Sequence, residues 1–505
     1  MKKSRPDFKS KYFELKEQLN KLNRIGMSLS SEHNLDTLLE MILCEARHFT
    51  QADAGSLYLK EGNRLKFVIA QNDTLSRKGH KEPFRSFYVK ISKESIAGYV
   101  AATGRPLNIK DAHRIPESKD YRFDQSFDKK MGYRTRSILA IPMKNHENEI
   151  IGVLQLINAL DQRGKTIAFT GENKELVSSL ASQAAVAIQN TKLIYQIKSL
   201  FRSLVEYSAS AIDARSPHTA GHSRRVCQYA LRMAQAINVQ EKGPFARTHF
   251  NEEELEELEF SAWLHDIGKI GVREWVLEKS DKLSKGWMEA VNNRFDSLKK
   301  GIANQALTRK NELLLDGVHD EEQFNQLNAQ AEQITRELDE ELDFIKRVNT
   351  SGFMGDEDIE RLDELLKRGY ISLFEYENLS VRKGNLTEEE RKEIQSHINY
   401  GVGILSKIPF PRNLAHIPFY AGCHHEMLNG EGYPKGLKEG DIPLQARILA
   451  VADIFDALTA ADRPYKKAVP IDKALNILQK EAEIGHLDPE IIKLFIEERL
   501  YGGVK

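Results

Sequence analysis

The sequence predicts a multidomain protein in which an α/β domain and an all-α domain are joined by a long helix. Three observations lead to this fold class. The chain has 505 residues, enough for two to four domains at roughly 100–200 residues each. Short strand-like apolar runs occur before residue 160, whereas apolar residues keep a helical spacing from Leu176 to Leu204 and again at 255–264 and 448–458. A polar segment at 282–383 then interrupts the second half, which indicates an inserted helical segment.

Composition restricts the classes of partner. The formal net charge is −1, from 73 Lys+Arg against 74 Asp+Glu. This balance argues against nucleic acid as a partner and gives no reason to expect docking on an anionic membrane. No apolar run approaches the roughly 18 residues of a membrane span, and three widely separated cysteines favour a reducing compartment. We therefore expect a soluble, cytoplasmic protein.

Residues 8–31 predict the first helix, because apolar residues recur in it at intervals of three and four. This helix either packs on the domain that follows or forms a short dimer seam. Residues 33–190 then read as the α/β domain. Its expected elements are helices at 35–48 and 176–188 and strands at 54–59, 65–70, 137–142 and 151–158. The turn Glu61-Gly62-Asn63 joins the first two strands as a hairpin.

This block resembles a GAF domain, with the resemblance carried by Ala54–Leu59, Gly98–Ala101 and Ser182–Ile188. The resemblance implies a small-molecule sensor and dimerisation module. Members that bind cyclic nucleotides often carry an Asn-Lys…Phe…Asp-Glu signature. Asn158 and Phe169 fit that signature, whereas Ala159, Asn173 and Lys174 do not. A small-molecule effector of another kind and a structural role both remain open.

The helix that closes the α/β domain is expected to continue as a connector over 176–212, because no Gly or Pro occurs before Pro217. At 1.5 Å per residue, such a helix spans about 50 Å. It could be an ordinary packed helix. A parallel seam between two copies explains its apolar stripe better, since one helix between two domains cannot bury that stripe alone. We expect a parallel homodimer through the N-terminal and connecting helices.

Histidines and aspartates in the second half predict a metal site. Nine of the 15 histidines lie between His218 and His425. Charged groups inside apolar helices are rare unless they are paired or bind metal. Imidazole and carboxylate without thiolate suit Fe, Mn or Zn in an open catalytic site, and the number of candidates exceeds what one ion needs. The candidates are His218 and His222 at i, i+4, His265-Asp266 after the helix 255–264, His397 on a charged helix that begins at Thr387, His424-His425, and Asp453 and Asp456 in the helix 448–458.

These motifs, in this order, resemble the HD-GYP subgroup of HD-superfamily phosphohydrolases over about 205–285 and 384–500. The resemblance implies an all-helical domain that cleaves cyclic dinucleotides, typically cyclic di-GMP, at a centre of two or three metal ions. It is carried by His265-Asp266-Ile267-Gly268-Lys269, His424-His425-Glu426, Gly430–Gly436, Ala452–Thr459 and Asp462–Lys466.

Transferred position by position, the resemblance assigns a role to each candidate. It implies two divalent transition-metal ions per chain, with Fe and Mn favoured. Asp266 and Lys269 are the expected catalytic residues, with Lys269 facing the phosphate. The first ion would be held by His222, His265, Asp266 and Asp453, the second by His397, His424 and His425 with Asp266 bridging, and the substrate by Lys269, Arg463, Lys466 and the turn Gly432-Tyr433-Pro434.

Three departures from the family pattern affect these expectations. His218 stands where members with a third ion carry Glu, so we expect a binuclear site with His218 as an additional candidate ligand. His265 and His397 are 132 residues apart, which indicates an insertion at 285–383. The segment Thr459–Arg463 is one residue longer than usual, which makes the placement of Arg463 and Lys466 less direct.

The sequence therefore predicts an N-terminal helix at 1–32, a GAF domain at 33–190, a connecting helix at 176–212 and an HD-GYP-like domain at 205–500 that contains the insertion. The expected function is hydrolysis of a cyclic dinucleotide, with cyclic di-GMP favoured. Two alternatives stand beside it. One is hydrolysis of another nucleotide, either a mixed cyclic dinucleotide or a noncyclic phosphoester. The other is a catalytically silent scaffold. The sequence argues against a scaffold, because every metal ligand of the motif series is present.

Overall fold

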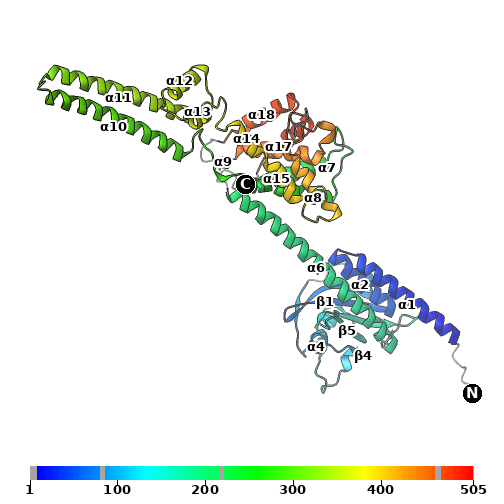
Figure 1. Ribbon diagram of the computed structural model, residues 1–505. Helices are drawn as coiled ribbons and strands as arrows, with labels where there is room; N and C mark the ends of the chain where they lie inside the picture. Colours follow the sequence, from blue (N-terminus) through cyan, green and yellow to red (C-terminus); the bar gives the residue numbers. More distant parts are fainter. Residues whose placement is uncertain (1–7, 80–85, 216–220, 461–467, 504–505) are drawn as a thin grey trace, which may run out of the picture. The chain divides into compact units, whose positions relative to one another are not determined.

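The computed structural model describes residues 8–79, 86–215, 221–460 and 468–503 (Figure 1). It divides into two compact units at 1–200 and 201–505. Three residues singled out by the sequence, His218, Arg463 and Lys466, lie outside the described residues. Among the helices that the structure describes, none combines the length and apolarity needed to cross a membrane.

A seven-stranded sheet forms the centre of the first unit. The strand order is β3-β2-β1-β6-β5-β4, with β7 paired to β6, and every pairing is antiparallel. The predicted hairpin is the β1–β2 pair, in which Glu61 lies opposite Arg64. The strands are β1 (Ala52–Glu61), β2 (Arg64–Asn72), β3 (Tyr88–Lys90), β4 (Leu107–Ile109), β5 (Ile138–Lys144), β6 (Ile150–Leu160) and β7 (Thr166–Ile167).

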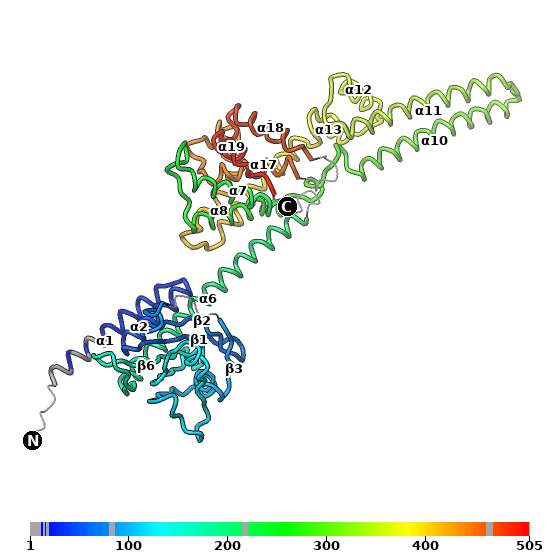
Figure 2. The backbone as a smooth tube through the Cα atoms, turned by 180° about the vertical axis from the view of Figure 1, so that it is seen from behind, coloured from blue at the N-terminus to red at the C-terminus, as the bar shows by residue number. Residues whose placement is uncertain are grey.

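Helices cover both faces of this sheet, because successive side chains of a strand point to opposite faces. Leu57 and Leu59 pack with three long helices, α1, α2 and α6, whereas Tyr58 packs with α4 on the other face. Figure 2 shows α1 and α2 beside α6. The helical elements of this unit are α1 (Phe8–Ser31), α2 (Leu35–Thr50), α3 (Asp73–Arg77), α4 (Ile96–Thr103), η1 (Ala112–Arg114), α5 (Ser126–Met131) and the beginning of α6 (Gly171–Arg215).

The C-terminal half of α1 packs on its own domain. Leu22, Ile25 and Leu29 are buried in the core that α1 shares with α2 and α6. A Cβ at Gly26 would come within 2.3 Å of Gln183 Oε1, so α1 lies close against α6 at this point. Of the two alternatives for this helix, the structure therefore shows packing on the following domain over Leu22–Leu29.

The second unit is helical (Figure 1). Its main core joins α7, α8, α17, α18 and α19 through residues such as Ala230, Leu258, Val451 and Phe495, all of which are buried. Its elements are α7 (His222–Asn238), α8 (Glu252–Leu264), η2 (Ile267–Gly271), α9 (Glu274–Leu277), α14 (Glu388–Gln395), α15 (His397–Leu405), η3 (Arg412–Leu414), α16 (Ile417–Gly422), η4 (Glu439–Asp441), α17 (Leu444–Thr459), α18 (Ile471–Glu483) and α19 (Pro489–Glu497).

The segment expected as an insertion forms a helical hairpin with its own core. Helices α10 (Lys285–Leu315) and α11 (Glu321–Asn349) lie side by side, followed by α12 (Asp356–Lys367) and α13 (Leu373–Leu379). Buried residues of this segment, including Phe295 and Ile345, form a cluster of their own. The two ends of the segment meet at Lys282, whose buried ammonium donates to the carbonyl oxygens of Leu379 at 2.9 Å and Val381 at 2.7 Å.

Candidate metal centre

Seven predicted metal ligands come together from different parts of the helical unit. Each lies inside a helix, at the end of one or in the turn that follows it. All are buried except His425, which is partly buried. They are His222 at the start of α7, His265 after α8, Asp266 before η2, His397 at the start of α15, His424 and His425 after α16, and Asp453 within α17.

The expectation for the helix that carries His397 is corrected by the structure. The capping box at Thr387 and Glu390 is present, and it begins α14 as the sequence indicates. This charged helix ends at Gln395, however, and His397 is the first residue of the separate helix α15. The break at Ser396 contains neither Gly nor Pro, so the sequence offers no signal for it.

Asp266 lies at the centre of the cluster. One carboxylate oxygen, Oδ2, is 3.5 Å from His222 Nε2 and 3.3 Å from His265 Nε2. The other oxygen, Oδ1, is 3.3 Å from His397 Nε2. The two oxygens therefore face different groups of histidines, which is the arrangement that a bridging carboxylate requires.

The donor atoms fall into three overlapping sets, in each of which all atoms lie within 4.8 Å of one another. Asp453 connects two of them, because its Oδ1 is 3.2 Å from His222 Nε2 and its Oδ2 is 3.9 Å from His425 Nδ1. The sets are His222 with His265 and Asp453, His397 with His424 and His425, and His265 with Asp266 and His424. His424 therefore lies near donors of both groups.

Three histidines present a buried nitrogen without a hydrogen-bond partner. The Nε2 atoms of His265, His397 and His424 have none among the described residues. On the opposite side of each ring, Nδ1 bonds the carbonyl oxygen three residues earlier, at 2.6–2.7 Å. Such a bond fixes the proton on Nδ1 and leaves the Nε2 lone pair for a metal. Since an unpaired buried polar atom is costly, these three nitrogens fit a metal ion.

The charge states of His424, His425 and Asp266 suit metal ligands. At His222, by contrast, Asp453 and Asp456 raise the pKa of the imidazole to about 10 against the effect of burial, so a metal ion would displace a proton there. Burial holds the pKa of His424 well below its ordinary value and lowers the pKa of His425 to about 4, so both rings are neutral at physiological pH. Burial would raise the pKa of Asp266, but Lys269 and His265 together hold it well below the ordinary value. Neutral imidazole and ionised carboxylate are the forms that bind a metal.

Asp456, named from the sequence among the metal candidates, lies behind His222 as a positioning residue, and Arg225, which the sequence did not single out, supports it. Asp456 Oδ2 lies 2.8 Å from His222 Nδ1, on the side of the ring away from the centre. Arg225, one turn after His222, holds Asp456 through Nε to Oδ1 at 2.7 Å and Nη2 to Oδ2 at 3.1 Å. A carboxylate behind a histidine ligand orients the ring and increases its basicity. The i, i+3 spacing of Asp453 and Asp456 was the signal in the sequence that could have identified the role of Asp456.

Lys269 reaches the centre from η2. Its Nζ donates to Asp266 Oδ2 at 2.5 Å. Glycine at 268 makes this placement feasible, because a Cβ there would lie only 1.8 Å from the His397 carbonyl oxygen. The Ile-Gly-Lys sequence thus lets η2 lie directly on α15 and brings Lys269 beside the histidines.

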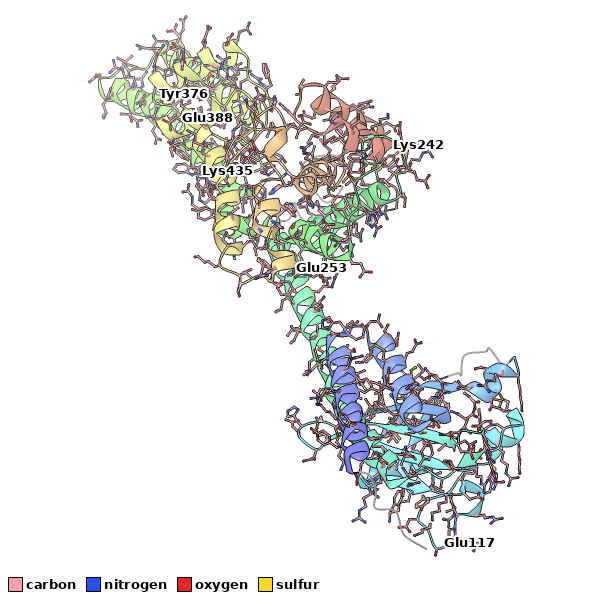
Figure 3. All side chains as sticks on the ribbon, turned by 90° about the vertical axis from the view of Figure 1, so that its right-hand side faces the viewer. Glu117, Lys242, Glu253, Tyr376, Glu388 and Lys435 are labelled. Carbon is pink, nitrogen blue, oxygen red and sulfur yellow. The ribbon has the colours of Figure 1, made fainter. Side chains whose placement is uncertain are left out.

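The loop after His425 forms one wall of the site. Tyr433 N donates to the His425 carbonyl oxygen at 3.1 Å, and the two rings lie 4.9 Å apart between centroids. Gly432 is required, since a Cβ there would lie 2.3 Å from Met427 N. The peptide bond before Pro434 is cis. Glu426 fixes this loop, because its carboxylate accepts from the backbone N–H groups of Lys435 and Leu437, both at 2.8 Å. No role was assigned to Glu426 from the sequence. Lys435 is labelled in Figure 3.

The sheet domain contains a separate cavity of about 340 Å³. Aromatic residues Tyr58, Phe67 and Phe123 contribute to its lining, together with polar groups such as Gln155. Asn158, which fitted the cyclic-nucleotide signature, does not line it. Its side chain instead accepts from Arg136 N at 2.7 Å and donates to Tyr133 Oη at 3.0 Å, so it is used within the fold.

Comparison with protein families identifies the domains. The GAF domain family matches residues 34–188. HD domain families match the helical unit in two parts, at 219–313 and at 369–491.

Curated relatives match short parts of the chain. A 3'3'-cGAMP-specific phosphodiesterase 3 of Vibrio cholerae is 45% identical over 109 residues, which are 22% of this chain and 23% of that protein. A 3'3'-cGAMP-specific phosphodiesterase 1 of the same organism is 36% identical over 120 residues, 24% of this chain and 27% of that protein. A cGMP-specific 3',5'-cyclic phosphodiesterase of Drosophila melanogaster is 32% identical over 176 residues, 33% of this chain and 15% of that protein. The chain thus spans less than a third of the length of each of these three relatives.

Among solved structures, the GAF domain of an Acinetobacter phosphoenolpyruvate-protein phosphotransferase is 17% identical to this chain, with a TM-score of 0.27. The match covers 36% of this chain and 98% of that structure.

Proposed function

We propose that this chain, which carries a GAF domain followed by an HD domain, is a metal-dependent phosphodiesterase that hydrolyses a cyclic dinucleotide. The observation that carries the proposal is the cluster of His and Asp donors around Asp266, with three buried Nε2 atoms that lack a hydrogen-bond partner among the described residues. The names of the Vibrio cholerae relatives support the substrate class.

Two divalent transition-metal ions would bind here. His222, His265, Asp266 and Asp453 would hold the first, and His397, His424 and His425 the second, with Asp266 shared. Donors without thiolate suit Fe, Mn or Zn, among which the family resemblance favours Fe or Mn, and His218 is an additional candidate ligand. When bound, the ions supply Lewis acidity and a hydroxide nucleophile at neutral pH.

The protein's own residues orient the reaction. Asp456 and Arg225 hold the ring of His222, and the Nδ1 bonds to backbone carbonyls fix His265, His397 and His424. Lys269 would offset negative charge that develops on the phosphate. Gly432, Tyr433 and Pro434 would form the wall for the substrate, and Arg463 and Lys466 would contact its second phosphate.

The substrate that we propose is a cyclic dinucleotide containing guanine. The motif series favours cyclic di-GMP, whereas the relatives' names favour 3'3'-cGAMP. Both share the macrocycle with two phosphodiesters, and the site chemistry described above acts on the phosphodiester. The nucleobase of the substrate that lies next to Gly432-Tyr433-Pro434 would then decide which of the two cyclic dinucleotides is preferred.

The test is a hydrolysis panel with anaerobically purified protein of known metal content. Cyclic di-GMP, 3'3'-cGAMP, cyclic GMP and a noncyclic phosphodiester are compared at equal concentration, and linear products are separated by chromatography. We expect a linear dinucleotide from at least one cyclic dinucleotide and none from Asp266→Ala. Faster cleavage of the noncyclic ester would favour the alternative phosphohydrolase, and no cleavage at full metal occupancy would favour a silent scaffold.

We also propose the division of the chain. The N-terminal helix would comprise 1–32, the GAF domain 33–190, the connecting helix 176–212, and the HD-GYP-like domain 205–500 with its insertion at 285–383. The family matches at 34–188, 219–313 and 369–491 support this division. A small-molecule effector would bind in the GAF cavity and regulate hydrolysis.

A further inference from the structure

The turn that follows α18 lies against the loop that forms one wall of the metal site, residues 426–437, which we call the wall loop. Leu428 N donates to the His486 carbonyl oxygen at 3.1 Å, and Asn429 N donates to the Gly485 carbonyl oxygen at 2.8 Å. Gly485 has a φ of +79°, a conformation that favours glycine. The backbone of this turn therefore supports the start of the wall loop directly.

The ring of His486 lies between two carboxylates that come from different elements. Its Nδ1 is 2.6 Å from Oε2 of Glu481, which belongs to α18. Its Nε2 is 3.2 Å from Oε2 of Glu431, which belongs to the wall loop. The His486 side chain is only 19% exposed, whereas Glu431 is 72% exposed. His486 thus connects the exposed part of the wall loop to α18.

Asn429 holds the Glu431 carboxylate in position for this contact. Its Oδ1 accepts from Glu431 N at 3.0 Å, and its Nδ2 donates to Glu431 Oε2 at 2.9 Å. Glu431 immediately precedes Gly432 and Tyr433, which are part of the proposed wall for the substrate. A change in the contact at Glu431 is therefore passed directly to the wall.

The geometry requires the protonated form of His486. Only an imidazolium can donate to both carboxylates, because a neutral ring has a single N–H. The neutral ring keeps its proton at Nδ1, which makes the shorter contact with Glu481, and its Nε2 lone pair then faces the Glu431 carboxylate. Loss of the proton therefore removes the contact with the wall loop and keeps the contact with α18. The hydrogen bond with Glu481 raises the pKa of His486, burial opposes this effect, and the hydrogen bond with Glu431 raises the pKa further.

These two glutamates determine the charge state of the ring. No other charged side chain contacts the ring nitrogens of His486 in the part of the chain that the structure describes. Asp488 lies two residues later, but its carboxylate is held by Arg447 at 3.1 Å and by backbone N–H groups at the start of α19.

We propose that His486 is a positioning residue: as an imidazolium it holds the wall loop on α18 and keeps Gly432-Tyr433-Pro434 in place for the substrate. At higher pH the neutral ring releases Glu431, so KM rises. The kcat stays unchanged, because no metal ligand contacts the His486 ring among the described residues. The contact between His486 and the wall loop stands on geometry, and only its effect on KM rests on the proposed function.

Hydrogen exchange measured by mass spectrometry tests the contact without substrate. Peptides that span 428–437 are compared in wild type, His486→Gln and the control His416→Gln. His416 also pairs with a glutamate, Glu257, at 3.2 Å, but it does not contact the wall loop in the described structure. At pH 6 we expect exchange about two- to fivefold faster in His486→Gln than in wild type, as for a partly exposed ion pair, and no change in the control. Equal exchange in wild type and His486→Gln at pH 6 would overturn the proposal.

The pH dependence of KM distinguishes the charge of His486 from a structural role. With metal-loaded protein and a cyclic dinucleotide as substrate, the KM of His486→Gln should exceed that of wild type about two- to fivefold at pH 6. The two KM values should converge above the pKa of His486, with equal kcat throughout. Glu481→Gln should move the rise in KM of the otherwise unchanged protein to lower pH, because Glu481 makes the largest contribution to the raised pKa.

The outcomes of the two measurements are distinct. A KM ratio that does not change with pH would show a structural role for His486 and would overturn the proposal. No turnover in any variant, together with the expected exchange difference at pH 6, would support the contact with the wall loop and refute the proposed function.

Discussion

Asp456→Asn offers a test of how the metal centre is held together. Asp456 is almost fully buried, and its Oδ2 lies 2.8 Å from His222 Nδ1. The substitution keeps the shape of the side chain but removes the charge that supports the imidazole and pairs with Arg225. Changes of this kind behind a histidine ligand cost roughly 10–100-fold in metal affinity, which corresponds to about 1.4–2.7 kcal/mol.

The loss should be confined to one ion. The Nδ1 atoms of His397 and His424 donate to the carbonyl oxygens of Ile394 and Ala421, so these two rings are oriented without Asp456. Competition with a chromophoric chelator, performed anaerobically on wild type and Asp456→Asn, resolves the two affinities. We expect one of them to weaken 10–100-fold and the other to stay within about threefold.

A matched control is available in Asp488→Asn. Asp488 is also buried and also pairs with an arginine, Arg447, at 3.1 Å, but it caps α19 and contacts no histidine in the described structure. It should lower stability without changing either metal affinity. Equal weakening of both ions by Asp456→Asn, or no change in either, would refute the assignment of His222 to one of two distinct sites.

Three further changes test other parts of the account. Lys269→Ala should lower kcat roughly 10–1000-fold with metal content intact, because it removes one charge-stabilising group; loss of metal or of folding would instead indicate that its pairing with Asp266 is structural. Burial lowers the pKa of Lys282 from 10.5 to about 8, so the unfolded chain binds more protons between these values and stability should rise with pH in that window. Lys282→Met should lack this rise, and an equal change of the urea-unfolding midpoint between pH 7.5 and 9.5 in both proteins would contradict the assignment. Replacing 303–335 by a short Gly/Ser turn should keep two ions and measurable hydrolysis, because the buried cluster of the insertion is formed by residues outside 303–335. We expect the change to alter KM. A metal-free variant would show that the hairpin completes the catalytic core.

Much of the fold follows from local patterns in the sequence. The β1–β2 hairpin was predicted because two apolar runs flank the turn at Glu61–Asn63, and the observed strands are longer than predicted at both ends. The connecting helix was expected at 176–212 and is observed from Gly171 to Arg215. Its ends differ because periodicity locates the middle of a helix better than its termini.

The surroundings of the metal ligands could not be predicted in the same way. The motif series indicated which histidines and aspartates to examine, but the pairing of Asp456 with His222 and Arg225 depends on the packing of α17 against α7. Glu426 likewise acts through backbone N–H groups, which leave no trace in side-chain patterns. The end of α14 before His397 escaped prediction because Ser396 keeps helical dihedral angles, φ −64° and ψ −13°.

We propose that seven side chains form a site for two ions that share Asp266. The most direct measurement is the number of transition-metal ions per chain, determined by elemental analysis of anaerobically purified wild type and Asp266→Ala. We expect two ions in the wild type and reduced occupancy of both in the variant. One ion or none in the wild type, or a variant that loses only one of two, would contradict it.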